Sequence, residues 1–176
     1  MIAGRLGGRR LAGLAGRSVR PTADRVREAI FAILGDTVVE ARILDLYAGT
    51  GALAIEAISR GAAEAVCVDR SGSARRTIRA NVESMGIDGE VDVIGDDALR
   101  YARRLSGGEE RFDVVFCDPP YADPLDAIVS EAVATNWWDR AFVLEHAAGR
   151  ATPEPPADAT AETRRYGDTE VTFFWR

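Results

Sequence analysis

Short apolar runs alternate with segments whose apolar side chains recur at helical spacing along most of this chain. The runs predict buried strands, and the recurring spacing predicts helices that bury one face. The predicted strands cover 42–46, 65–68, 91–94, 112–117, 141–145, 161–166 and 169–175. The predicted helices cover 23–34, 51–60, 72–85, 97–105 and 124–135. This order predicts βαβ units, and therefore an α/β fold with a doubly wound, mostly parallel sheet.

The two ends of the chain depart from this alternation. A tight turn at Gly167-Asp168 joins the last two predicted strands, so we expect the last strand to be antiparallel. Residues 1–20 are rich in Gly and Arg and predict a basic N-terminal arm or hairpin. Residues 21–176 then form one α/β domain, with Thr22 as the expected N-cap of its first helix.

Composition narrows the class of protein. Apolar residues make up 47% of the chain, which is enough to fill a core. No apolar run reaches the roughly 18 residues of a membrane-spanning helix. The N-terminus lacks a signal-peptide pattern, so we expect a cytoplasmic protein. Cys67 and Cys117 each lie within an apolar run, which argues against a disulfide framework or a metal site.

Positive charge is concentrated at the N-terminus. The chain carries a formal net charge of −6, yet residues 1–20 contain arginines and no acidic residue. A basic segment on an acidic body indicates contact with an anionic partner, and a solvated tail is the alternative. The candidate residues for this contact are Arg5, Arg9, Arg10, Arg17 and Arg20.

Distinctive residues follow the first predicted strand, at the edge of the sheet where ligands of open α/β folds bind. Gly49 and Gly51 fit the turn of a dinucleotide site, which makes a nicotinamide-dependent dehydrogenase one interpretation. Asp45 favours a different interpretation, because a carboxylate before these glycines repels a pyrophosphate and attracts an ammonium group. An ammonium near a ribose and a base describes S-adenosylmethionine. Asp69, after the second strand, is then the candidate for the ribose.

Two more acids follow the third predicted strand. Either Asp96 or Asp97 is a candidate to accept a hydrogen bond from the adenine amine of this cofactor. N-capping of the next helix by Asp96 is the structural alternative, and both roles are compatible.

The run Asp118-Pro119-Pro120-Tyr121 is the most specific motif of the chain. Its two prolines fix φ near about −65° and make a rigid turn directly after a buried strand. Asp118 and the Pro119 carbonyl offer two acceptors, and Tyr121 offers a ring for base stacking. Two acceptors on an exocyclic amine point its lone pair at a methyl donor. The motif therefore predicts methyl transfer to a nucleobase amine, with a simple Pro-rich turn as the alternative.

These motifs resemble those of the bacterial 16S rRNA (guanine(966)-N2)-methyltransferase family, and the resemblance runs nearly end to end. Arg20-Pro21-Thr22 and the basic arm point to this family in particular, since the other motifs are shared with many amino methyltransferases. The matching segments are Ile2–Arg5, Gly7–Arg9, Arg20–Thr22, Asp24–Glu28, Asp45–Gly51, Ser59–Ala62, Phe112–Asp113, Asp118–Tyr121 and Tyr166–Gly167.

The resemblance implies a seven-stranded, Rossmann-like class I methyltransferase sheet with S-adenosylmethionine as the methyl donor. It implies that the methyl acceptor is the N2 amine of one guanine in 16S rRNA, within the assembled small ribosomal subunit. It also implies that the protein acts as a monomer and needs no metal. It also implies catalytic roles for Asp118, Pro119, Pro120 and Tyr121. The implied cofactor residues are Asp45, Tyr47, Ala48, Gly49, Gly51, Asp69, Asp97, Ala98 and Asp118.

Other functions stay open from the sequence. An adenine-N6 DNA methyltransferase uses the same chemistry but usually needs a separate target-recognition domain. A glutamine methyltransferase acting on proteins usually carries Asn at position 118 and has no need of a basic arm. A dehydrogenase, or a non-catalytic nucleotide-binding module, represents a different class of protein.

Overall fold

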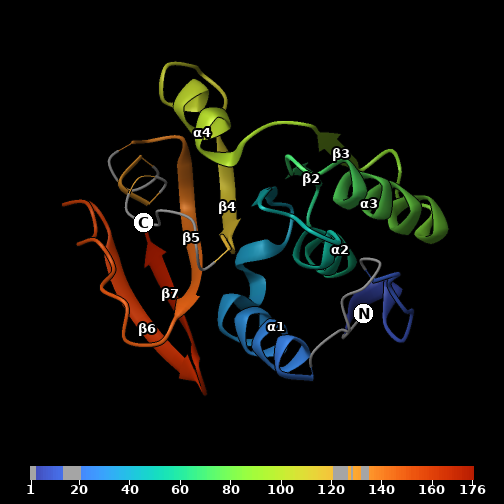
Figure 1. The fold of residues 1–176 in the computed structure, drawn as a ribbon, viewed down its shortest axis with the longest axis horizontal. Coiled ribbons are helices and arrows are strands. Elements are labelled where there is room, and N and C mark those ends of the chain that lie inside the picture. The colour runs from blue at the N-terminus through green and yellow to red at the C-terminus, as the bar shows by residue number, and fades with distance from the viewer. Residues whose placement is uncertain (1–2, 14–20, 121–126, 128, 132–134) are drawn as a thin grey trace.

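One mixed sheet organises the chain in the computed structural model, which describes residues 3–13, 21–120, 127, 129–131 and 135–176 (Figure 1). Its strands run in the order β3-β2-β1-β4-β5-β7-β6. Strands β3, β2, β1, β4 and β5 are parallel to their neighbours, whereas β7 is antiparallel to both β5 and β6. The strands are β1 (Arg42–Leu46), β2 (Glu64–Val68), β3 (Val91–Ile94), β4 (Phe112–Cys117), β5 (Trp138–Ala147), β6 (Thr160–Tyr166) and β7 (Thr169–Trp175).

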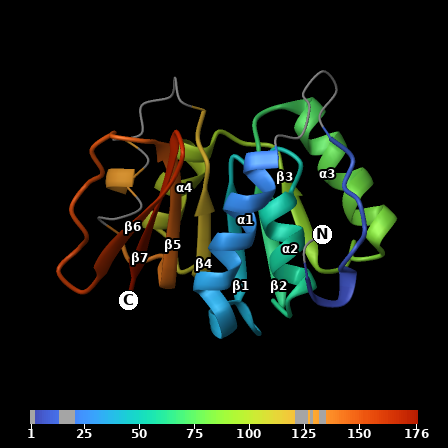
Figure 2. The same cartoon turned by 90° about the horizontal axis from the view of Figure 1, so that it is seen from below.

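Helices cover both faces of the sheet, as a doubly wound fold requires. The helices are α1 (Pro21–Leu34), α2 (Ala52–Ser59), α3 (Gly72–Met85) and α4 (Ala98–Ser106). In Figure 2, α1, α2 and α3 lie in front of the strands and α4 lies behind them. Each face has its own apolar core, with Phe31 and Ile78 in the first and Tyr101 and Phe142 in the second. The predicted α/β class and antiparallel last strand are confirmed.

Three local predictions are wrong for physical reasons. Strand β5 begins at Trp138 rather than at residue 141, because its polar start is held by an ion pair between Arg140 and Asp113. Helix α1 begins at Pro21, which suits the first helical position, so Thr22 lies inside the first turn and is not the N-cap. Asp97, not Asp96, caps α4 by accepting a hydrogen bond from the Arg100 N–H at 3.1 Å. Of the predicted helix 124–135, residues 127 and 129–131 are helical, residue 135 is a bend rather than helix, and the rest lies outside the described residues.

Residues 3–13, named here the N-terminal segment, lie along α2 and α3 (Figure 2). They contain a 3₁₀ turn at Gly4–Leu6 and no strand, so this described part of the chain is not a hairpin. Leu6 is buried, and its N–H donates to Ser59 Oγ at 2.9 Å. Gly4 has a φ of 74°, and a Cβ there would lie 1.8 Å from the Ser59 carbonyl oxygen. The segment is therefore fitted closely onto α2.

Within the described residues, no helix is both long and apolar enough to cross a membrane.

Candidate functional site

Four acidic residues form a row across adjacent strands at the carboxyl edge of the sheet. Asp45 pairs in register with Cys67 of β2 and Phe116 of β4, and the register between β4 and β5 places Asp118 beside Glu145. Asp69 directly follows β2. We name these residues, in spatial order, the carboxylate row: Asp69, Asp45, Asp118 and Glu145.

The carboxylate row lies on one face of the sheet. Side chains alternate between the two faces of a strand. Cys67, Phe116 and Val143 belong to the core beneath α1, α2 and α3. Glu145 shares that face because it follows Val143 by two positions in β5, and Asp45 shares it because it is in register with Cys67 and Phe116. Asp69 and Asp118 come directly after β2 and β4. The sequence motifs thus meet on the side of the sheet that carries the N-terminal segment.

Loss of contact with water raises the pKa of three acids of the row, Asp45, Asp118 and Glu145. Desolvation raises the pKa of Asp45 to about 8, although a hydrogen bond from the Ala54 N–H at 3.3 Å works against the rise. Burial and the nearby charge of Asp118 raise the pKa of Glu145 to about 8. Asp118 reaches solvent, but the protein atoms crowded around it reduce its hydration and raise its pKa to about 6. Among the ion pairs between described residues, none involves these three carboxyls.

Residues 47–51, named here the glycine loop, connect β1 to α2 through left-handed backbone. Tyr47, Gly49 and Gly51 have φ values of 63°, 56° and 76°. Such a conformation at a non-glycine residue is costly and is typical of functional loops. A Cβ on Gly51 would lie 3.2 Å from Ile78 Cγ2, whereas a Cβ on Gly49 would meet nothing nearer than the Tyr47 carbonyl oxygen at 3.8 Å. Gly51 therefore packs on α3, and Gly49 leaves open space for a ligand.

Asp69 ties this loop to the end of β2. One of its carboxylate oxygens accepts a hydrogen bond from the Gly49 N–H at 2.9 Å, and the other accepts one from the Ser71 N–H at 2.7 Å. In this arrangement Asp69 orders the glycine loop, and its predicted contact with a ribose stays a prediction.

The acids after β3 divide their roles. Asp96 is buried, and its carboxylate bonds to the guanidinium groups of Arg100 and Arg104. These hydrogen bonds outweigh desolvation and lower the pKa of Asp96. The partly exposed Asp97 caps α4 with one oxygen, and its other oxygen is 3.9 Å from the Arg70 guanidinium. Asp96 is therefore structural, and Asp97 with the buried Ala98 keeps the predicted adenine role.

The proline turn after β4 is described only in part. Pro119 is buried and Pro120 is exposed at the carboxyl edge of the sheet, next to Asp118. Tyr121 lies outside the described residues, so its predicted stacking role has no structural test here.

The arginines of the N-terminal segment differ from one another. Arg5 forms an ion pair with Glu90, and Arg9 Nη1 donates to the Met85 carbonyl oxygen at 3.2 Å. Arg10 is exposed. Arg17 and Arg20 lie outside the described residues. Contact of these arginines with RNA stays a prediction.

Glu145 is the site residue that sequence reasoning missed. It lies two residues before the end of β5 and belongs to no motif, so nothing in its sequence neighbourhood marks it. The signal is topological, because β5 lies next to β4 and its end therefore lies next to Asp118.

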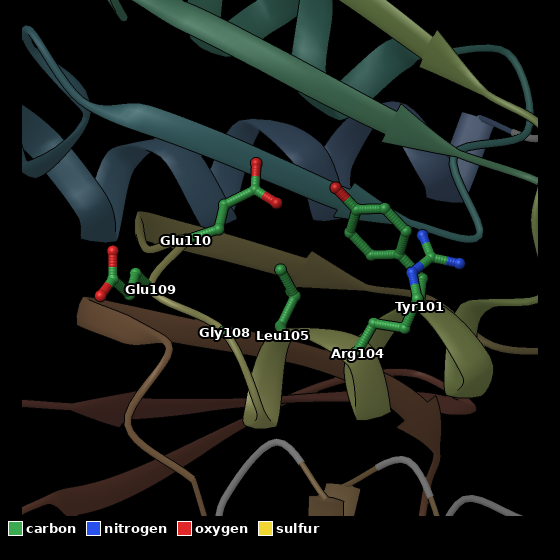
Figure 3. Close-up of a pocket in the computed structure, with 6 residues that line it drawn as sticks. All are labelled: Tyr101, Arg104, Leu105, Gly108, Glu109 and Glu110. Carbon is green, nitrogen blue, oxygen red and sulfur yellow. The ribbon is translucent and has the colours of Figure 1, made fainter.

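A small cavity lies elsewhere, at the opposite edge of the sheet, where the chain enters β4. Figure 3 shows its lining, which includes no residue of the carboxylate row and comes from α4 and the loop before β4. The lining residues are Tyr101, Arg104, Leu105, Gly108, Glu109 and Glu110. In the part of the chain that the structure describes, no three His, Cys, Asp or Glu side chains converge to hold a metal ion.

Known proteins resemble this chain over almost its whole length. The family profile described as "Conserved hypothetical protein 95" matches residues 1–175. The Bacillus subtilis protein named "Putative rRNA methyltransferase YlbH" is 34% identical, covering 99% of this chain and 97% of the relative. "Ribosomal RNA small subunit methyltransferase D" of Escherichia coli K12 is 31% identical, covering 90% of this chain and 79% of the relative. The solved structure "Putative methyltransferase yhhF" from Escherichia coli superposes with a TM-score of 0.87 at 27% identity, covering 100% of this chain and 96% of that one.

Proposed function

We propose a function from the premise that this chain belongs to the protein family described as Conserved hypothetical protein 95. The chain transfers a methyl group from S-adenosylmethionine to the exocyclic N2 amine of a guanine in 16S rRNA. The two named relatives, an rRNA methyltransferase and a small-subunit rRNA methyltransferase, support rRNA as the substrate. The resemblance drawn from the sequence supports guanine as the base.

The carboxylate row supports the proposal that the cofactor is a cation. S-adenosylmethionine carries an ammonium and a sulfonium, and both charges favour ionised carboxylates nearby. Desolvation raises the pKa of Asp45 and of Glu145 to about 8, and neither carboxyl has an ion pair among the described residues. A pyrophosphate-bearing nicotinamide cofactor would add negative charge to this row. The same observation therefore argues against the dehydrogenase.

Each candidate residue has a place in holding the cofactor. Asp45 would face the ammonium, the open side of Gly49 would admit the ligand, and Asp69 would bind the ribose. Asp97 and Ala98 hold the adenine, on the same edge of the sheet. Bound S-adenosylmethionine supplies a methyl group that is already electrophilic, because it is attached to a sulfonium.

The protein's main task is then to position the base. Asp118 and the Pro119 carbonyl accept hydrogen bonds from the N2 amine, so its lone pair points at the methyl carbon at about 3–3.5 Å. The nitrogen–carbon bond forms as the carbon–sulfur bond breaks, and the guanine nitrogen loses one proton. Asp118, with a pKa of about 6, is placed to take this proton and release it to water.

One observation carries the proposal, namely that Asp118 of the proline turn lies beside Asp45 near the end of β1 and Glu145 near the end of β5. The test is transfer of a labelled methyl group from S-adenosylmethionine to small ribosomal subunits lacking this modification, followed by nucleoside analysis. N2-methylguanosine in 16S rRNA is the expected product. Label in adenine or in protein would instead indicate one of the other amino methyltransferases, and no label with tight NAD binding would indicate a dehydrogenase.

The proposal extends to the setting of the reaction. The substrate is the assembled small subunit rather than naked RNA, and the enzyme works in the cytoplasm as a monomer. Parallel assays with naked 16S rRNA and with assembled subunits separate the two substrate forms.

A further inference from the structure

Asn81 is a buried polar residue on the apolar face of α3. It is 1% exposed and lies one turn after Ile78, in a stripe that otherwise packs against the sheet. A buried amide is stable only when its donors and acceptor are satisfied. Its side chain makes no bond within α3, so its partners come from elsewhere.

One set of partners is in the N-terminal segment. The Ala12 N–H donates to Asn81 Oδ1 at 2.7 Å, and Asn81 Nδ2 donates to the Ala12 carbonyl oxygen at 3.2 Å. The Asn81 side chain thereby bonds to both the N–H and the carbonyl of Ala12, as the backbone of a neighbouring strand would. Arg10, two residues earlier, is one of the proposed phosphate contacts.

The other partner is in the glycine loop. Asn81 Nδ2 also donates to the Thr50 carbonyl oxygen at 3.0 Å. Thr50 lies between Gly49 and Gly51, both in left-handed conformation, and the bond from Asn81 adds to the one that Asp69 accepts from the Gly49 N–H. A single amide therefore links the loop that faces the cofactor to the segment that carries the basic residues.

We propose that Asn81 is a positioning residue that couples the two ligands, so that bound RNA and bound cofactor strengthen each other's binding. The inference rests on the proposed function, because it assigns the cofactor to the glycine loop and RNA to the N-terminal segment. Coupling of this kind is reciprocal: whatever factor RNA contributes to cofactor affinity, the cofactor contributes to RNA affinity.

The experiment measures the dissociation constant of S-adenosylhomocysteine by calorimetry, with and without saturating small ribosomal subunits. The native chain should bind S-adenosylhomocysteine at least about 5-fold more tightly when RNA is bound. Asn81→Ala should weaken binding about 10-fold without RNA, because the Thr50 and Ala12 groups lose their partner. For this variant, the ratio of the dissociation constant without RNA to that with RNA should fall to about 1.

Two more variants separate coupling from folding. Asn81→Asp keeps the size of the side chain and the oxygen that accepts from the Ala12 N–H. It loses the donors to the Ala12 and Thr50 carbonyl oxygens, so the ratio of its two dissociation constants should also fall. Ser84→Ala removes only the bond from Ser84 Oγ to the Asn81 carbonyl oxygen on the same helix, and should keep the native ratio. Thermal unfolding confirms that each variant is folded.

The outcomes are distinct. A native ratio near 1, or an Asn81→Asp variant that keeps the native ratio, would overturn the coupling and leave the proposed function intact. A native chain that binds neither S-adenosylhomocysteine nor the subunit would overturn the proposed function itself, and the coupling with it.

Discussion

The carboxylate row and the N-terminal segment use charge in opposite ways. The row withdraws Asp45 and Glu145 from water and gives them no cation within the described part of the chain. The segment keeps Arg10 in water and attaches itself through backbone bonds to Ser59 and Asn81. Buried charge is costly and so indicates a site prepared for a ligand of opposite sign. Exposed charge costs little and contributes small, additive contacts. We therefore expect single substitutions to have large effects in the row and small effects in the segment.

The largest effect is expected at Asp118. Asp118→Ala removes an acceptor for the amine and should reduce methyl transfer by about 10³-fold, within the usual range for a positioned proton acceptor. Binding of S-adenosylhomocysteine should persist. Asp118→Asn keeps a carbonyl acceptor but cannot take a proton. It is the matched control and should lose less methyl-transfer activity than Asp118→Ala. Unchanged turnover of Asp118→Ala in the labelled-methyl assay would remove the residue from the mechanism.

The pH dependence of turnover comes next. Asp118 must be ionised to take the proton that the amine loses, and its pKa of about 6 is raised above that of a free carboxyl by desolvation. With S-adenosylmethionine saturating, the value of kcat/KM for the RNA substrate should therefore rise about 10-fold per pH unit below pH 6 and level off above it. A pH series with Asp118→Asn should lose this slope, and a native profile that is flat between pH 5 and 7 would contradict the assignment.

A smaller effect is expected where the N-terminal segment joins α2. Gly4→Ala places a Cβ against the Ser59 carbonyl oxygen, so the segment should detach while the sheet stays folded. RNA affinity should then fall by roughly 5- to 10-fold, as several phosphate contacts lose their position. Gly8 is the matched control, because it has a similar φ of 78° but open space around it. Equal losses of RNA affinity in Gly4→Ala and Gly8→Ala would show that RNA binding does not depend on packing of the N-terminal segment against α2.

The smallest effect is expected for a single arginine of the segment. Arg10→Ala should weaken RNA binding by roughly 3-fold and make it less sensitive to salt, as loss of one phosphate contact does. Cofactor affinity without RNA should not change. Arg103→Ala, on α4 behind the sheet, is the control and should bind RNA normally. An Arg10→Ala variant with native affinity and salt dependence would exclude Arg10 from the interface.

Much of the fold was predictable because apolar runs in this chain end at Gly, Asp or Pro. The bounds of β3, β4 and α3 match the predicted ones for that reason, and those of β1 and β7 also match. The start of β5 was not predictable, since Asp139 and Arg140 break the apolar run and are held by ion pairs with Arg111 and Asp113. Such cross-strand pairing becomes visible only once the register is known.

The candidate site was predictable where a motif carries it. Asp45 and Asp118 stand in motifs whose spacing reveals their place at strand ends. Glu145 and Asn81 were missed, because their importance comes from neighbours more than 25 residues away in the chain, such as Asp118 and Thr50. The attachment of the N-terminal segment was missed for the same reason, since composition alone suggested a free arm.

That attachment also fixes an order of assembly. Arg5 pairs with Glu90, and Ala12 with Asn81, so the first part of the chain to be synthesised has its partners among residues made much later. During translation the basic residues therefore stay undocked until α3 and the start of β3 have left the ribosome. The surface proposed to bind RNA is therefore complete only after β1, β2 and α3 have been made.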